Sequence, residues 1–271
     1  MPGVLSVISI VVAVATAILL GVTAKLTTDR IPLSSAEDDY KPAAISWVKG
    51  EPNAIGDHWT MFNVVAAIVS AVSGIAVALF SPYGRQIQDH ASTTSDVSIC
   101  ILAIVSAAML GFHLVWSSCL DWRFHMIPRW ALVTHMSMQL VVTVTCLAVS
   151  DHYSWLILSV ILTSVMCWMV GLLSGMSDGR LYVIVAASVI PFMMTDAWLP
   201  AVVVGAAAIL NAIASTVTGG SMTHDERDGD ENLAVRLLKA KSPMGPFVST
   251  VFYVFFMLYV FDVLPSMTPL L

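Results

Sequence analysis

Eight apolar stretches follow one another along the chain, and short polar segments separate them. A helix needs roughly 20 mostly apolar residues to cross the hydrocarbon core of a bilayer, and most of these stretches are about that long. The sixth is shorter and contains Pro191, so its ends are the least defined. The predicted spans are residues 4–24, 60–80, 97–120, 130–149, 155–173, 181–194, 198–217 and 246–263. This pattern predicts an all-α, polytopic integral membrane protein of about eight transmembrane helices, with residues 1–271 forming a single membrane domain.

The composition agrees with this pattern. Hydrophobic residues make up 58% of the chain and charged residues only 11%, whereas a soluble domain carries about 25% charged residues. The mean hydropathy is +0.85. No basic stripe with interleaved aromatic residues is present, which argues against nucleic acid as a partner. The lipid bilayer is therefore the expected surrounding of most of the chain.

The lysines and arginines are distributed unevenly between the loops. If the N-terminus lies outside, the inside loops are 25–59, 121–129, 174–180 and 218–245, and they hold eleven of the twelve basic residues. Only Arg85 is left outside. Because basic residues are retained on the cytoplasmic side during insertion, we expect both termini to lie outside. The sequence thus predicts a multi-pass protein of the cytoplasmic (inner) membrane.

The carboxylates close to predicted span ends include Asp121, Asp178, Asp196 and Asp262. An ionisable group near the hydrocarbon is energetically costly and is therefore a functional candidate. Asp196 and Asp262 fall on the predicted outer side, and we interpret both as solvated. Asp121 closes the third span and Asp178 opens the sixth, so both face the predicted cytoplasmic side.

Two carboxyl groups held together in a partly dry site do not both ionise readily. They share a proton, so that one can activate water while the other polarises a carbonyl. This arrangement hydrolyses peptides without a metal or a nucleophilic side chain. The alternative is structural: Asp121 and Asp178 would reach toward the headgroups and pair with Arg123 and Arg180. The positions of the two aspartates alone leave both interpretations open.

The residues around the two aspartates favour a catalytic pair over a structural role. Asp121 is followed by Ile127 and Pro128, and residues 175–178 read Gly-Met-Ser-Asp. An aspartate ahead of Ile-Pro, with a second aspartate in a GxGD motif, resembles the type IV prepilin peptidase family of membrane aspartic proteases. Residues 30–32 (Arg-Ile-Pro) and 243–247 (Pro-Met-Gly-Pro-Phe) resemble further motifs of that family, in the same order along the chain.

The resemblance implies that Asp121 and Asp178 are the catalytic pair. Gly175 matches the first glycine of the GxGD motif, whereas Ser177 stands where the family has glycine. Arg180 replaces a common lysine and keeps its positive charge. Serine lacks the backbone freedom of glycine, so position 177 is the departure that bears most directly on activity.

The resemblance also implies a substrate. It would be a prepilin-like membrane protein with a short basic leader ahead of an apolar helix, cleaved at the cytoplasmic face. Residues 97–263 would form the peptidase core. The expected setting is a type IV pilus or a related protein secretion system.

Bifunctional members of the family also methylate the mature pilin, and they hold zinc with two CxxC pairs in the first cytoplasmic loop. Here that loop, 25–59, contains no cysteine. The HExxH spacing of zinc proteases is also absent. We therefore expect neither a metal site nor a cofactor.

Three histidines lie near the first aspartate or inside the adjoining spans. His125 is four residues after Asp121 and is a candidate to orient it. His113 lies eight residues before Asp121, on roughly the same side of the helix. His135 lies in the fourth span. We expect His113 and His135 to make hydrogen bonds within the membrane.

Two other function classes remain open at this point. One is a catalytically inactive relative that acts as an assembly partner in a pilus or secretion system, an alternative that Ser177 motivates. The other is a proton-coupled transporter of small solutes, in which Asp121 and Asp178 would relay protons.

Overall fold

The computed structural model describes residues 2–28, 52–82, 94–124, 129–149 and 245–261, together with the isolated positions 161, 165, 205, 206, 209, 210, 213 and 263. The elements in these ranges are five α-helices. They are α1 (Pro2–Thr28), α3 (Pro52–Phe80), α5 (Thr94–Phe124), α6 (Arg129–Val149) and α11 (Gly245–Val260). The described part of the chain is therefore helical, as predicted.

Three of these helices contain segments long and apolar enough to cross a membrane: Val7–Leu26, Met61–Phe80 and Cys100–Asp121. They coincide with the first three predicted spans, which supports the prediction of a membrane protein. Two shorter apolar segments, Val133–Val142 and Ser249–Leu258, lie inside the fourth and eighth predicted spans. The fifth, sixth and seventh spans lie outside the described ranges, so the count of eight and the orientation stay predictions.

The helices extend beyond the predicted spans at several ends. Helix α3 begins at Pro52, eight residues before the predicted start of its span. Proline is favoured in the first turn of a helix because its missing N–H has no partner there. Helix α1 likewise continues past its span to Thr28. Both extensions lie within residues 25–59, which the hydropathy pattern assigned to a loop. Hydropathy marks only the part of a helix that lies in the hydrocarbon core, and polar helical turns can extend beyond that part.

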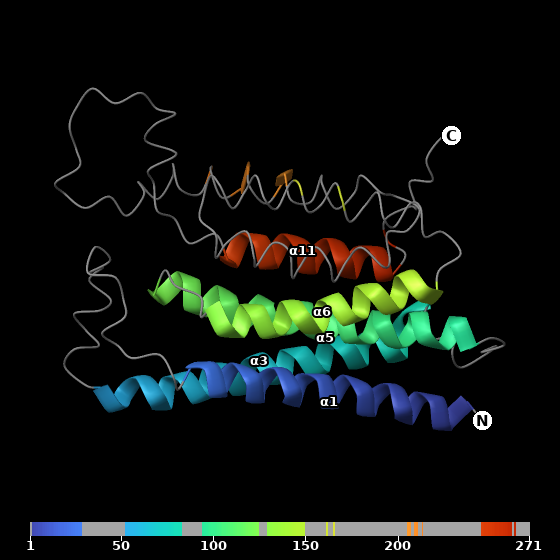
Figure 1. Ribbon diagram of the computed structural model, residues 1–271, viewed down its shortest axis with the longest axis horizontal. Coiled ribbons are helices and arrows are strands. Elements are labelled where there is room, and N and C mark those ends of the chain that lie inside the picture. The colour runs from blue at the N-terminus through green and yellow to red at the C-terminus, as the bar shows by residue number, and fades with distance from the viewer. Residues whose placement is uncertain are drawn as a thin grey trace.

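Helix α5 lies at the centre of the described bundle. It packs against α1, α3, α6 and α11, and Figure 1 shows these helices side by side. The buried share of the membrane-spanning segment is 78% in α5, 33% in α1 and 39% in α3. Side chains from α5 are therefore the best placed to form an interior site.

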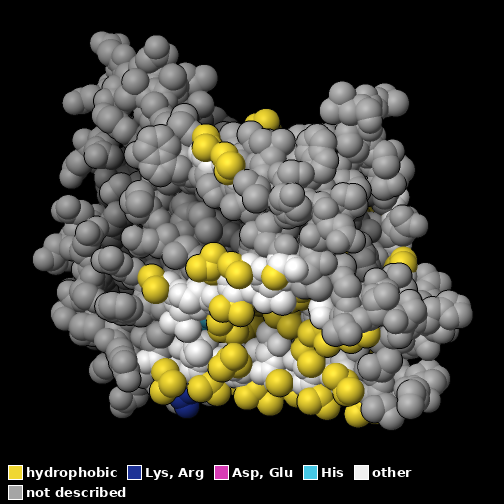
Figure 2. Space-filling model, turned by 45° about the vertical axis from the view of Figure 1, so that its right-hand side comes forward, with side chains coloured by type: hydrophobic (Ala, Val, Ile, Leu, Met, Phe, Trp, Pro, Cys, Tyr) yellow, Lys and Arg dark blue, Asp and Glu magenta, His cyan; other side chains and the backbone are white. Residues whose placement is uncertain are grey.

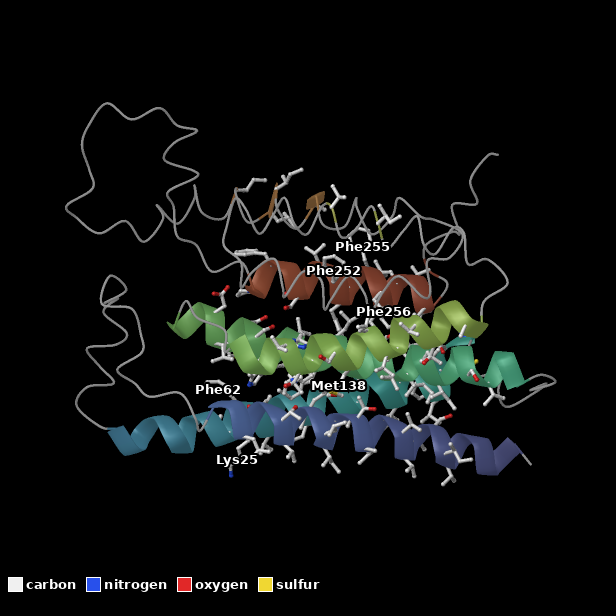
Figure 3. The ribbon with its side chains drawn as sticks, viewed as in Figure 1. Lys25, Phe62, Met138, Phe252, Phe255 and Phe256 are labelled. Carbon is white, nitrogen blue, oxygen red and sulfur yellow. The ribbon has the colours of Figure 1, made fainter. Side chains whose placement is uncertain are left out.

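Helices α1, α3, α5 and α6 alternate in direction along the chain (Figure 1). Gly21 lies beside Ala67 and Gly74 lies beside Ala13, so the later position of α1 meets the earlier position of α3 and the two helices are antiparallel. Ser70 of α3 donates a 2.7 Å hydrogen bond to the carbonyl of Ala108 on α5. Helices α1 and α5 consequently end at the same end of the bundle, and Figure 3 marks that end by Lys25. This end is called the Lys25 end below.

The outer faces of α1 and α3 carry large apolar side chains. Figure 2 shows hydrophobic side chains spread over the lower face of the molecule. Exposed residues on the two helices include Val11, Ile18, Val22, Ile68 and Val72. Such a surface is stable in contact with lipid chains, and it leaves the polar side chains of the bundle for the interior.

Candidate functional site

Four polar side chains form a stripe along the buried face of α5: Ser106, His113, Ser117 and Asp121. The first three are fully buried, and Asp121 is 5% exposed. At 3.6 residues per turn these positions fall within a sector of about 80° on the helix. The stripe begins within the apolar segment of α5 and ends at Asp121, the last residue of that segment.

Asp121 thus lies where its side chain is almost removed from solvent, at the Lys25 end of the central helix. Burying an ionised carboxylate is costly unless it is paired. The position is unusual for an aspartate whose only role is to reach solvent. The apolar segment of α5 ends at Asp121, and the side chain of this residue is buried within the structure.

The other predicted site residues lie outside the described residues. Around the second aspartate these are Gly175, Ser177, Asp178 and Arg180. After the first aspartate they are His125, Ile127 and Pro128. The pairing of Asp121 with Asp178 therefore stays a prediction.

His113 and His135 meet inside the bundle, across the contact between α5 and α6. The His135 Nδ1 and His113 Nε2 atoms are 3.1 Å apart. On the other side of the same ring, His135 Nε2 lies 3.2 Å from Thr23 Oγ1 of α1. This confirms the expected intramembrane hydrogen bonds and joins three helices through one chain of polar contacts.

Aromatic rings surround this histidine pair. The ring centroids of His113 and His135 are 4.9 Å apart in an edge-to-face arrangement. Trp116 stands 6.0 Å from His113 and 5.6 Å from His135, and Phe112 stands 5.6 Å from His135. Aromatic walls exclude water and strengthen the polar contacts that they enclose.

A second interhelical contact lies one turn closer to Asp121. Ser117 Oγ donates a hydrogen bond to the carbonyl of His113, and it lies 3.2 Å from Ser249 Oγ on α11. One turn further along α11, the Tyr253 hydroxyl lies 2.9 Å from Ser73 Oγ of α3. Hydroxyl groups thus tie α11 to α5 and to α3.

Several buried polar atoms have no hydrogen-bond partner in the described structure: Asn63 Oδ1, Ser106 Oγ, His113 Nδ1, Trp116 Nε1 and Ser118 Oγ. Four of the five belong to α5. An unpartnered polar atom inside a protein is costly, and it calls for an explanation such as a water molecule, an ion, local strain or a catalytic role. Among the described residues, no three His, Cys, Asp or Glu side chains gather around a position that a metal ion could occupy.

His113 and His135 were predicted separately from the sequence, whereas the contacts of Thr23, Ser117 and Ser249 were not predicted. One signal for the stripe was available. Positions 106, 113, 117 and 121 are polar within an otherwise apolar run and follow helical spacing. The contacts of Thr23 and Ser249 carry no comparable signal, since each depends on how two helices are rotated against each other.

Comparisons of the chain with protein-family models, with curated proteins and with solved structures found no match.

Proposed function

We propose that this protein is a membrane aspartic endopeptidase that cleaves the cytoplasmic leader of prepilin-like proteins with Asp121 and Asp178. One structural observation carries the proposal. The Asp121 side chain is 5% exposed and ends a buried polar stripe on the central helix. A carboxyl group in this position is expected to have a functional partner, and the GxGD-like context of Asp178 makes that residue the candidate.

The proposed reaction is general acid–base hydrolysis. Water held between the two carboxyl groups loses a proton to the ionised one while the protonated one donates to the carbonyl oxygen of the scissile peptide. The tetrahedral intermediate then collapses, and the leaving amine takes up a proton. Such leaders remain in the cytoplasm, so cleavage would take place at the Lys25 end of the bundle.

The test is cleavage of a co-expressed prepilin-like substrate, followed as a shift in its size. Asp121→Asn and Asp178→Asn should each abolish the mature product, because an amide cannot accept the proton from water. Asp196→Asn is the matched control, since Asp196 lies at a predicted span end on the other side of the membrane, and it should cleave like wild type. Mature product from both single variants would refute the proposal.

Position 177 separates the peptidase from an inactive relative. If wild type never yields mature product whereas Ser177→Gly does, the chain is better described as an assembly partner that has lost its activity. Equal cleavage by both proteins would show that serine preserves the approach of the substrate backbone.

The buried histidine pair favours proton-coupled transport of a small solute as a second candidate. His113 and His135 lie in the bundle interior, and such residues in membrane proteins often mark proton pathways. Solute uptake that depends on a proton gradient, by a wild-type protein that cleaves no prepilin-like substrate, would support this function.

A further inference from the structure

Two polar contacts hold α5 to neighbouring helices in the turns just before Asp121. His113 Nε2 lies 3.1 Å from His135 Nδ1 on α6, and Ser117 Oγ lies 3.2 Å from Ser249 Oγ on α11. Positions 113, 117 and 121 follow one another at intervals of nearly one helical turn. Apolar burial contributes little to the association of helices in lipid, so such contacts weigh heavily in the rotation of α5. That rotation determines where the Asp121 carboxyl group lies.

Thr23 of α1 completes the first of these contacts. Its Oγ1 atom lies 2.9 Å from the carbonyl of Leu19 and 3.0 Å from that of Leu20. A carbonyl only accepts hydrogen bonds, so the hydroxyl proton of Thr23 is directed to the backbone. The Thr23 oxygen therefore accepts a hydrogen bond from Nε2–H of His135, which is 3.2 Å away.

This hydrogen bond selects the tautomers of both imidazoles. A neutral ring carries one proton, so His135 Nδ1 is unprotonated and accepts from Nε2–H of His113. In the opposite arrangement His113 would carry its proton on Nδ1, an atom that is buried without a partner. The observed contacts favour the first arrangement, because it alone gives every N–H of the two rings an acceptor.

The preference depends on the hydroxyl group at position 23. If that group were lost, the first arrangement would leave the His135 Nε2–H buried without a partner, and the second would leave the His113 Nδ1–H in the same state. The two arrangements would then be similar in energy. Thr23 therefore determines how His113, and with it α5, is bonded to α6.

We propose that Thr23 is a positioning residue for Asp121 and acts through His135, His113 and the rotation of α5. This inference rests on the proposed peptidase function. A side chain ends about 5–6 Å from the axis of its helix, so a rotation of about 10° moves the carboxyl group by about 1 Å. A misplacement of about 1 Å costs about 10²-fold in rate. Thr23 influences the reaction without contacting the reacting atoms.

Cleavage kinetics of the full-length protein in lipid nanodiscs, with a purified prepilin-like substrate, test this role. Thr23→Val replaces the hydroxyl group by a methyl group of similar size. It should lower kcat at least about tenfold and leave KM within about twofold of wild type, because only the alignment of the carboxyl group changes. Thr23→Ser keeps the hydroxyl group and should restore kcat.

Thr145→Val is the matched control. The Thr145 hydroxyl donates to the carbonyl four residues earlier in α6, as that of Thr23 does in α1. Thr145 is exposed, and it makes no side-chain contact with a histidine of the described helices. Its kcat and KM should equal those of wild type.

Nuclear magnetic resonance of the protein with ¹⁵N-labelled histidine reports the tautomers independently of activity. In wild type, His113 and His135 should both show a protonated Nε2 and an unprotonated Nδ1. In Thr23→Val, each ring should show a mixture of its two tautomers. Thr23→Ser and Thr145→Val should show the wild-type pattern.

The positioning role has clear contrary outcomes. A protonated Nδ1 on His135 in wild type would overturn it without any variant. Wild-type kcat in Thr23→Val would overturn it even where that variant unfolds at a lower temperature. A loss of kcat that Thr23→Ser does not restore would show an effect of packing alone. Absence of cleavage by the wild-type protein is a different failure, because it refutes the proposed function and the positioning role with it.

Discussion

Single residues decide how closely the helices of this protein approach each other. A Cβ atom added to Gly111 of α5 would stand 2.5 Å from Ser73 Oγ and 3.0 Å from the carbonyl oxygen of Val69, both on α3. A Cβ on Gly74 would stand 2.8 Å from that of Ala13 on α1. Small residues at such crossings allow backbones in a membrane to pack closely. The lack of a side chain at these two positions therefore sets the spacing of α1, α3 and α5.

We expect Gly111→Ala to lower the free energy of unfolding by about 1–3 kcal/mol, because the added methyl group forces α3 and α5 apart. Thermal unfolding of the purified protein in detergent micelles measures the change.

Gly205→Ala is the control for this prediction. A Cβ at Gly205 meets nothing within 4 Å, and alanine favours a helix over glycine by about 0.5–1 kcal/mol. This variant should be at least as stable as wild type. If Gly111→Ala behaved in the same way, the close contact of α3 with α5 would be wrong.

At the scale of elements, α5 combines two roles that the other described helices do not share. It is the most buried of the three membrane-spanning helices, and it carries the polar stripe that ends at Asp121. Its contacts with α6 and α11 run through side-chain hydrogen bonds. In lipid, where apolar burial between helices contributes little, such bonds and close packing hold the helices together.

A double-mutant cycle on Ser117 and Ser249 tests the contact between α5 and α11. Ser117→Ala, Ser249→Ala and the double variant should give a coupling energy of about 0.6 kcal/mol, the usual value for such bonds between membrane helices. Unfolding in detergent micelles measures each variant.

The control cycle combines Ser249→Ala with Thr145→Val, because Thr145 is exposed and bonded within its own helix. Independent sites should show no coupling. Equal coupling energies in the two cycles would contradict a direct bond between Ser117 and Ser249.

On the scale of the whole molecule, α1, α3, α5 and α6 alternate in direction, and α1 and α5 end together at the Lys25 end (Figure 1). Helix α11 begins at that end as well, since Ser249 in its first turns contacts Ser117 near the end of α5. This is the direction that the last of eight alternating spans would take. The uneven distribution of basic residues predicts that the Lys25 end faces the cytoplasm.

Thiol labelling of intact cells tests this orientation. In a variant with Cys100, Cys119, Cys146 and Cys167 replaced by alanine, Lys25→Cys should react with an impermeant maleimide only after the membrane is opened. Arg85→Cys, at the one basic position on the predicted outer side, should react in intact cells. The reverse pattern would place the termini in the cytoplasm and would remove Asp121 from the side where leaders are cut.

The sequence by itself determined the class of this protein and the positions of the membrane segments that the structure describes. Hydropathy is a local property, since about 20 apolar residues suffice to specify a span wherever the rest of the chain lies. It also singled out Asp121, because a charge at a span end is costly without any knowledge of its neighbours.

Only the tertiary structure decided which polar side chains meet. Thr23, His113 and His135 come from three helices, and their contacts depend on how each helix is rotated and shifted against the others. Those parameters are determined by close packing at positions such as Gly74 and Gly111, which no pattern along one helix reveals. The hydrophobic pattern thus placed the helices in the membrane, whereas packing between them created the buried hydrogen-bond chain and turned Asp121 inward.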